Sequence, residues 1–444
     1  MRALTGDRRR VAVIGSGVAG LTAAWVLARD CEVILYEADS RLGGHAHTHR
    51  VPARADGTGE LLGVDSGFIV HNARTYPTLL RLFGELGVRT QESEMSMSIR
   101  CDGCGLEYAG GKGPRGLIPN PGIARPRAYL RMLGEITRFH RLARAELAGE
   151  GDELRTLGDF LRAGRFSEFF TAHFMVPLVA AVWSCPPNLA VQYPARSLFT
   201  FLDHHGMLTV FGAPTWRTVS GGSASYVAAV AAGVHEVRSG VPVRAIHRAA
   251  RTVAVRDDAD EVDFFDAAVI ATHPDQALRL LDAPTLAEAE VLAALPYSSN
   301  RTVLHTDDTV LPRRVGARAS WNYRLPHCAA APDRVLVSYD VTRLQRLPAG
   351  DRRFLVTLGD DDRVAPETVL AAMTYEHPQY TPSAMAARRR LPKIGDHTVA
   401  FAGAYHGWGF HEDGALSGLR AAERLGGRWV TGASMAIASA QEVP

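Results

Sequence analysis

The chain has 444 residues, of which 46% are hydrophobic and 22% charged, and its formal net charge is +2. A chain of this length is too long for one simple hydrophobic core, so we expect two domains. The small net charge gives no reason to propose nucleic acid as a partner. The sequence has no stretch of about 18 uninterrupted apolar residues that could span a membrane. The five cysteines are an odd, scattered set, which predicts reduced thiols and a cytoplasmic setting.

The N-terminal segment has the pattern strand, turn, helix, strand. Val11 to Ile14 and Val33 to Tyr36 are apolar runs typical of buried parallel strands, and Leu21 to Ala28 between them is typical of a buried helix. Glu37 ends the second strand, close to the spacing expected of an acid that binds a ribose. This order predicts a dinucleotide-binding unit.

The turn between the first strand and the helix carries G-x-G-x-x-G. Gly15 permits a tight turn, Gly17 lets backbone amides approach a pyrophosphate, and Gly20 lets the helix pack on the strand. The helix N-terminus adds a positive dipole at the phosphates. The G-x-G-x-x-G motif alone is weak evidence for dinucleotide binding. Here it is strong evidence, because it lies between a predicted strand and helix that are followed by a second strand and Glu37.

A second glycine pair follows the acid, in Arg41-Leu-Gly43-Gly44-His45. The whole order, ending in Arg-x-Gly-Gly, resembles the flavin-containing amine oxidase and phytoene desaturase superfamily. The resemblance implies FAD as cofactor, with Glu37 on the adenosine ribose and Arg41 near the pyrophosphate. It also implies an α/β fold in which a Rossmann-like, GR2-type FAD-binding domain is interleaved with an α+β substrate domain.

We assign residues 1–95, 205–285 and 390–444 to the FAD-binding domain, and 96–204 and 286–389 to the substrate domain. His45, His47 and His49 alternate and would share one face of a strand. A metal site there is the weaker alternative, because no matching ligands follow. The resemblance places His45 beside the flavin as a hydrogen-bond donor or proton-transfer group, and Gly67 and Phe68 beside the isoalloxazine ring. We interpret His71 as a satisfied core histidine.

Alternation from Glu94 to Ile99, followed by Cys101-Asp-Gly-Cys104, predicts a hairpin. Asp-Gly is a turn signal, and no second cysteine pair follows at zinc spacing, so we favour a turn over a metal or redox site and predict no metal. Helical periodicity dominates residues 129–174. The resemblance places Trp183 in the substrate pocket, with core packing as the alternative.

The chain then returns to the cofactor domain. Val243 matches the strand whose backbone touches adenine in the superfamily, and residues 264–272 form a buried strand. At the position where amine oxidases usually carry a lysine that holds a water against the flavin, this chain has Asn300 and Arg301. That departure argues against amine oxidation. Tyr323, in a strand-rich stretch, is assigned to the substrate pocket.

The C-terminal segment resembles the superfamily's closing motif, in which a strand, an acid and a helix N-terminus meet the flavin. The residues that the resemblance assigns to the cofactor are Gly403, Glu412, Asp413 and Ala415. Those that it assigns to the aromatic substrate pocket are Tyr405, Trp408 and Phe410. His411 and Glu412 are further catalytic candidates after His45.

These motifs together resemble a bacterial group of predicted NAD/FAD-binding, amine-oxidase-related proteins. Neighbouring cyclopropane-fatty-acid-synthase-like methyltransferases suggest a lipid substrate for that group. A second nucleotide fingerprint is missing from the sequence, so we expect hydride transfer from substrate to flavin. We therefore predict an FAD-dependent dehydrogenase or desaturase acting on an apolar, fatty-acyl or lipid substrate.

Three alternatives stay open: a peroxide-releasing amine oxidase, a redox-neutral flavin-dependent isomerase, and a non-catalytic FAD-binding protein. The electron acceptor, oxygen or another redox partner, is also open. So is peripheral membrane contact, although no basic amphipathic helix indicates it.

Overall fold

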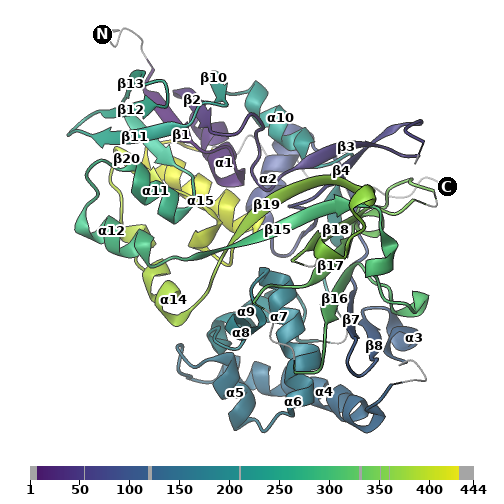
Figure 1. Ribbon diagram of the computed structural model, residues 1–444. Coiled ribbons are helices and arrows are strands. Elements are labelled where there is room, and N and C mark those ends of the chain that lie inside the picture. Colours follow the sequence, from purple (N-terminus) through teal and green to yellow (C-terminus); the bar gives the residue numbers. More distant parts are fainter. Residues whose placement is uncertain are drawn as a thin grey trace, which may run out of the picture.

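A parallel sheet with the strand order β10-β2-β1-β14-β20 forms the upper part of the molecule (Figure 1). The computed structural model describes residues 8–429, apart from 55, 119–122, 210–211, 330–332, 351 and 360. The strands of this sheet are β1 (Arg10–Ile14), β2 (Glu32–Glu37), β10 (Glu236–Ser239), β14 (Ala267–Ile270) and β20 (Val399–Phe401).

The strands β1, β2, β14 and β20 are largely buried on both faces, which explains why they are apolar runs without alternation, whereas the edge strand β10 is half-buried and mostly polar. Val11 and Val13 of β1 face one core, and Ala12 and Ile14 face another. The first core lies against α1 (Val18–Leu27), α2 (Pro77–Leu86), α10 (Ala224–Ala232) and α15 (His411–Arg424). The predicted order of strand, helix and strand is confirmed, and α2 ends at Gly87, whose φ is +65°.

The second core lies under an antiparallel sheet of β11 (Val243–Arg248), β12 (Val253–Asp257) and β13 (Val262–Phe265). The helices on this side are α11 (Pro274–Leu280), α12 (Leu286–Ala293) and α14 (Pro382–Arg388). The last two helices come from a range that the sequence assigned to the substrate domain. These helices pack against the parallel sheet, which we call the cofactor side. The domain boundaries stay a prediction.

A mixed sheet, in the order β19-β15-β18-β17-β16-β7-β8, crosses the middle and lower parts of Figure 1. Its strands are β7 (Met97–Cys101), β8 (Glu107–Gly110), β15 (Tyr297–His305), β16 (Trp321–Leu325), β17 (Val337–Asp340), β18 (Leu355–Leu358) and β19 (Val369–Pro378). β7 and β8 pair antiparallel, with the Asp102-Gly103 turn between them, so the predicted hairpin is confirmed.

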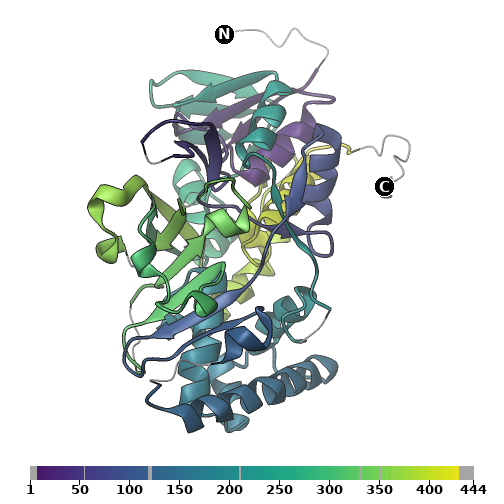
Figure 2. The same cartoon turned by 90° about the vertical axis from the view of Figure 1, so that its right-hand side faces the viewer.

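Helices gather at the end of the molecule opposite the parallel sheet (Figure 2). They are α3 (Gly113–Leu117), α4 (Pro126–Ala148), α5 (Leu157–Ala163), α6 (Glu168–Phe170), the π-helical η1 (Thr171–Met175), α7 (Val176–Trp183), α8 (Pro187–Ala190) and α9 (Ala195–His204). The predicted helical character of 129–174 is confirmed. Among the described residues, every helix is too short or too polar to cross a bilayer.

The remaining elements are short. They are the hairpin of β3 (Thr48–Pro52) and β4 (Leu61–Asp65), the sheet of β5 (His71–Asn72), β9 (Trp216–Val219) and β6 (Thr90–Glu92), and the helix α13 (Val341–Leu344). β3 and β4 pair antiparallel, so Thr48 lies opposite Asp65. This pairing brings Phe68 back beside His45, whose carbonyl oxygen accepts the Phe68 amide at 2.7 Å.

Candidate active site

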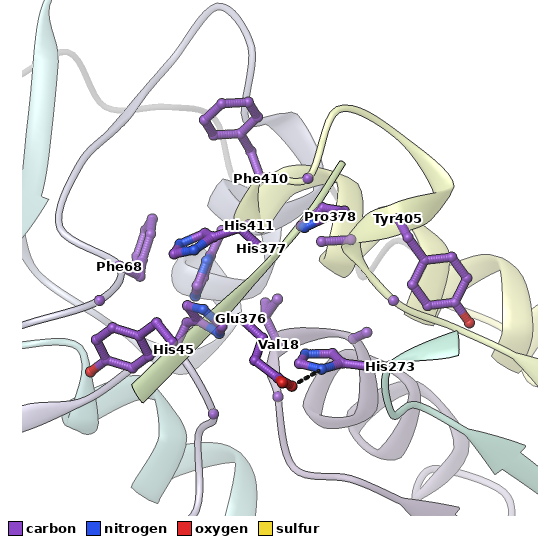
Figure 3. Close-up of a pocket in the computed structure, with 18 of the residues that line it drawn as sticks. Val18, His45, Phe68, His273, Glu376, His377, Pro378, Tyr405, Phe410 and His411 are labelled. Carbon is purple, nitrogen blue, oxygen red and sulfur yellow. Dashed lines mark hydrogen bonds and ion pairs between the residues drawn. The ribbon is translucent and has the colours of Figure 1, made fainter. Parts of the chain in front are cut away.

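A cavity of about 830 Å³ lies between the parallel sheet and the mixed sheet. Gly15, Glu37 and Gly403, at the carboxyl ends of β1, β2 and β20, line one side, and residues of α7, α9 and β16 to β18 line the other. Ligands of open α/β sheets bind at this edge, outside the carboxyl ends of the strands. Figure 3 shows the histidines and aromatic rings at its centre.

The glycine-rich turn has the geometry expected of a phosphate cradle. Gly15 has φ +97°, and a Cβ there would lie 2.8 Å from the Ala271 carbonyl oxygen. A Cβ at Gly20 would lie 1.9 Å from the Gly15 oxygen, so α1 packs directly on the turn. A Cβ at Gly17 would meet no atom within 4 Å. The open space therefore begins at Gly17, at the N-terminus of α1, where a pyrophosphate would fit.

Glu37 and Arg41 line the same end of the cavity. Glu37 accepts hydrogen bonds from the Ser16 amide (2.8 Å) and from the Asp39 amide (3.0 Å). Arg41 donates to the main-chain oxygens of Leu42 (3.0 Å) and Gly44 (2.9 Å), which holds the guanidinium against its own loop. An acceptor carboxylate and a fixed cation beside the open turn suit a ribose and a phosphate.

The second glycine pair completes the cradle. Gly43 has φ +108°, and its amide donates to Ser16 Oγ (3.0 Å), so this loop is tied to the first turn. A Cβ at Gly44 would lie 3.2 Å from the Gly17 Cα. The two glycine loops therefore approach more closely than larger residues would allow. Gly44 lines the cavity, whereas Gly20 and Gly43 shape the loops behind it.

His45 stands at the centre of the cavity. Its ring stacks on Tyr375, with centroids 4.8 Å apart, and meets the edge of His377 at 5.3 Å. Burial, with a smaller contribution from His377, holds the pKa of His45 well below its usual range, so the imidazole is neutral. Within the described residues, no hydrogen-bond partner reaches its Nε2 atom. A neutral ring with one free nitrogen can donate to or accept from a bound group.

Phe68 and His411 form the second aromatic pair at the cavity. Their rings stack at 3.7 Å with 12° between the planes (Figure 3). Burial, followed by His71, lowers the pKa of His411 to about 3, and its Nε2 also finds no partner in the described chain. Gly67 is required beneath this pair, since a Cβ there would lie 2.2 Å from the His45 carbonyl oxygen.

His71 is fully buried, as expected of a core histidine, but it is not satisfied. Neither ring nitrogen has a hydrogen-bond partner among the described residues. Burial lowers the pKa of His71 to about 4. Its neighbours are aromatic rings, with Phe83 at 5.5 Å between centroids. The ring is therefore held neutral in an apolar setting.

Glu412, which was predicted to be catalytic or to bind the cofactor, is engaged with another helix. Its two carboxylate oxygens accept the amides of Thr78 and Leu79, each at 3.0 Å. Those amides are unsatisfied donors in the first turn of α2, so the carboxylate caps that helix. Glu412 does not line the cavity.

Asp413 and Ala415 also lie outside the cavity lining, contrary to their predicted role at the cofactor. Asp413 accepts the Phe410 amide (2.9 Å) and closes the first turn of its own helix, α15. Burial raises the pKa of Asp413 to about 6. Ala415 is fully buried in the core that α15 shares with α1. Both residues position the helix and leave the contact with a bound group to the preceding loop.

Tyr323, which was predicted to lie in the substrate pocket, does not line the cavity. It is buried in the core of the substrate side, whereas Trp321 of the same strand lines the cavity. The two side chains share a strand face, but Tyr323 lies two residues farther along β16, a shift of about 7 Å. The composition of the strand does not reveal which of the two reaches the cavity.

The other predicted pocket residues are brought together at the cavity. Trp183, Tyr405, Trp408 and Phe410 all line it, as do the cofactor candidates Val243 and Gly403. The Trp183 indole donates to the main-chain oxygen of Trp408 at 3.0 Å, which joins α7 to the loop before α15. The roles of these residues stay predictions.

The strand β19 was missed entirely by the sequence analysis. It contributes Tyr375, Glu376 and His377 to the cavity, and Glu376 bonds His273 Nδ1 at 2.9 Å (Figure 3). Asn300, which the resemblance assigned to the lysine position of amine oxidases, lies on the paired strand β15, and its Nδ2 is 3.0 Å from His377 Nδ1. The only signal for β19 is its pairing with a strand about 70 residues away, which periodicity does not show.

The half of the cavity that faces β16 to β18 and the helices α7 and α9 is mainly apolar; we call it the apolar half. Its main lining residues are Val182, Trp183, Phe201, Met207, Trp216, Trp321, Tyr339, Leu344, Leu358, Trp408 and Phe410. Of the described residues that line this half, none is Asp, Glu, Lys or Arg. The charged lining residues Glu37, Asp39, Arg41, Arg279 and Glu376 lie on elements of the cofactor side or on β19.

Comparisons with known proteins place the chain in a class. The family model for flavin-containing amine oxidoreductases matches residues 18–426. The chain therefore belongs to the flavin-containing amine oxidoreductase family. It is an FAD-dependent oxidoreductase, and the open glycine cradle at Gly17 fits that cofactor.

Solved structures share the fold at low identity. Cyclohexylamine oxidase from Brevibacterium oxydans IH-35A is 17% identical with a TM-score of 0.67, over 94% of this chain and 98% of that one. Putrescine oxidase bound to putrescine is 15% identical with a TM-score of 0.66, over 95% and 99%. A conjugated-linoleic-acid (CLA)-producing fatty acid isomerase from P. acnes is 15% identical with a TM-score of 0.63, over 94% and 99%. No curated protein matches.

Proposed function

We propose that this oxidoreductase is a dehydrogenase or desaturase that takes a hydride from an apolar, fatty-acyl or lipid substrate. The apolar half of the cavity carries the proposal, because its described lining is mainly aromatic and aliphatic, includes Ser184 and His205 as polar side chains, and contains no Asp, Glu, Lys or Arg. An ammonium group moved from water into such a lining loses its hydration without gaining a counter-ion, whereas an acyl chain gains about 0.8 kcal/mol per buried methylene.

His45 is the first candidate for proton transfer, and His411 is the second. Bound FAD supplies the hydride acceptor. Each imidazole is held neutral by burial, and in the described part of the chain its Nε2 has no hydrogen-bond partner. A neutral histidine at this position can accept a proton from the substrate or donate a hydrogen bond to the cofactor. Glu412 is not proposed, because its carboxylate is occupied by α2.

An amine substrate is the second candidate. The family membership supports it, and so do the aromatic rings of Trp183, Trp408 and Phe410, because a cation can bind over an aromatic face. A redox-neutral isomerase is the third candidate, supported by the shared fold of the fatty acid isomerase. An amine oxidase would differ from the main proposal by releasing hydrogen peroxide. An isomerase would differ from it by transferring no net electrons to an acceptor.

Anaerobic mixing of the holoenzyme with substrate classes tests the proposal. Long-chain fatty acids and acyl esters are compared with alkylamines of matched chain length, and loss of the oxidised flavin absorbance is recorded. We expect bleaching by an acyl compound, which persists until an electron acceptor is added. Bleaching by amines alone, with peroxide on admission of air, would refute the proposal. A shifted double bond without lasting bleaching would favour the isomerase.

A further inference from the structure

Four potential metal ligands meet in the substrate side of the molecule, away from the cavity just described. They are Cys101, Cys104, His173 and Cys328, and their ligand atoms all lie within 4.8 Å of one another. The first three side chains are buried and Cys328 is half-buried. None of the four lines the cavity. We call them the Cys3His cluster.

Two of the separations between these atoms match the edges of a tetrahedron. Cys101 Sγ lies 3.8 Å from Cys328 Sγ, and Cys104 Sγ lies 3.7 Å from His173 Nε2. Around a zinc ion with Zn–S bonds of about 2.3 Å, two sulfurs of a tetrahedron are about 3.8 Å apart. The four ligand atoms, all within 4.8 Å of one another, therefore lie close enough for one ion to bind between them.

The hairpin turn prepares its two cysteines as ligands. Cys101 ends β7, and the Asp102-Gly103 turn brings Cys104 back beside it. The Cys101 amide donates to the Leu106 carbonyl oxygen at 2.8 Å, which closes this turn. A turn and a metal site are thus compatible at this motif.

His173 is oriented so that its Nε2 faces the cysteines. Its Nδ1 lies 3.2 Å from the Phe169 carbonyl oxygen, which can only accept, so Nδ1 carries the proton and Nε2 is left as a ligand. The ring also stacks on Phe169 at 3.9 Å. The residue lies in the π-helical η1, and π-helical turns are frequent at functional sites.

Cys328 reaches the cluster from the loop after β16. Leu325 pairs with Cys101 across the sheet, and a Cβ at Gly103 would lie 2.9 Å from the His327 Cα. The glycine in the turn thus allows the loop that carries Cys328 to approach closely. The cluster joins segments that are far apart in the chain, since His173 follows Cys104 by 69 residues and Cys328 follows Cys101 by 227.

We propose that Cys101, Cys104, His173 and Cys328 bind one structural Zn²⁺ ion. Three thiolates and an imidazole are the donor set that zinc prefers in closed tetrahedral sites. With all four positions filled by the protein, the ion has no place for water or substrate. It ties the β7–β8 hairpin and the β16 loop to η1, which continues into α7 and so to Trp183 in the apolar half.

Elemental analysis of the purified holoenzyme, expressed with added zinc, is the first test. We expect about one zinc per chain, falling to near zero in Cys328→Ala. Cys31→Ala is the matched control, since Cys31 is buried in the cofactor-side core, and it should keep its zinc. Cys328→His restores a ligand and should also keep the metal. Flavin content is measured in parallel and should be the same in all four proteins.

Cobalt substitution gives a readout that needs no variant. The Co²⁺-loaded holoenzyme should show tetrahedral ligand-field bands with thiolate charge transfer, at wavelengths separable from the flavin. A zinc-free protein that does not take up cobalt would overturn the proposal. So would zinc retained by Cys328→Ala, a native Cys101–Cys328 disulfide found by mass spectrometry, or iron in place of zinc.

Discussion

Replacement of Gly17 by alanine should separate cofactor binding from folding. Gly17 has φ −62° and ψ 171°, which alanine adopts without strain, and the added Cβ would meet no protein atom within 4 Å. Alanine is less favourable than glycine at the N-cap, which lowers the free energy of unfolding. Alanine also reduces the conformational entropy of the unfolded chain, which raises the free energy of unfolding by a similar amount. The free energy of unfolding of the apoprotein should therefore stay within about 1 kcal/mol of wild type.

The methyl group would instead occupy the space in which we place the pyrophosphate. A hydrogen bond from an amide to a charged group contributes about 1.5–3 kcal/mol, so its loss should weaken FAD binding about 10- to 150-fold. Flavin fluorescence titration of the apoprotein measures this Kd, and thermal unfolding measures the stability. Wild-type affinity in Gly17→Ala would refute our placement of the phosphates.

Two further glycines serve as controls for Gly17→Ala. At Gly20 the added Cβ would lie 1.9 Å from the Gly15 oxygen, so Gly20→Ala should destabilise the apoprotein itself by about 1–3 kcal/mol or more. Gly134, exposed within α4, has nothing within 4 Å of an added Cβ. Gly134→Ala should therefore raise the free energy of unfolding by about 0.5–1 kcal/mol and leave the FAD affinity unchanged.

Three other predictions follow from the site. His45→Gln should slow flavin reduction by substrate about 10²- to 10⁴-fold in stopped-flow measurements, while His49→Gln, outside the cavity lining, should react at the wild-type rate. Glu412→Ala should cost about 1–2 kcal/mol in denaturant unfolding, because two amides of α2 lose their acceptor, and loss of flavin instead would show that the acid serves the cofactor. Burial lowers the pKa of His71 to about 4 from 6.5, so the unfolded chain binds a proton that the folded chain does not. The free energy of unfolding should fall as the pH drops from about 6.5 to about 4, and His71→Phe should reduce that slope by about one proton; an unchanged slope would contradict the assignment.

The parts of the fold that could be predicted are those whose cause is local. Gly15, Gly20 and Glu37 lie in one strand–helix–strand unit, in which Gly15 has a positive φ, Gly20 packs on the Gly15 oxygen and Glu37 accepts the Ser16 amide. Gly17 lies in the same unit, and its role is predicted from the motif. The hairpin at Cys101 also has a local cause, because the Asp102-Gly103 turn forms it. Such features depend on turn chemistry and on the hydrophobic period, both of which a single sequence displays.

The features that were missed depend on contacts between distant segments. Glu412 has the position of an acid at a cofactor, yet its partners belong to a helix more than 300 residues earlier. Trp321 and Tyr323 differ only in their distance along one strand, and register decides which reaches the cavity. Cys328 and His173 join the cysteine hairpin only after the sheet and the helices have packed. Periodicity carries no information on any of these.

The order of the strands has a consequence for how the chain folds during synthesis. β7 lies in the mixed sheet beside β16, and the side chains of Ser96 and Ser320, 224 residues apart, are hydrogen-bonded. β1 needs β14 as its neighbour, and β14 in turn stays an open edge until β20 at 399–401 has emerged. Neither sheet can therefore close on the ribosome before nearly the whole chain is made. High contact order of this kind makes folding slow and leaves strand edges exposed, so the nascent protein should depend strongly on chaperones.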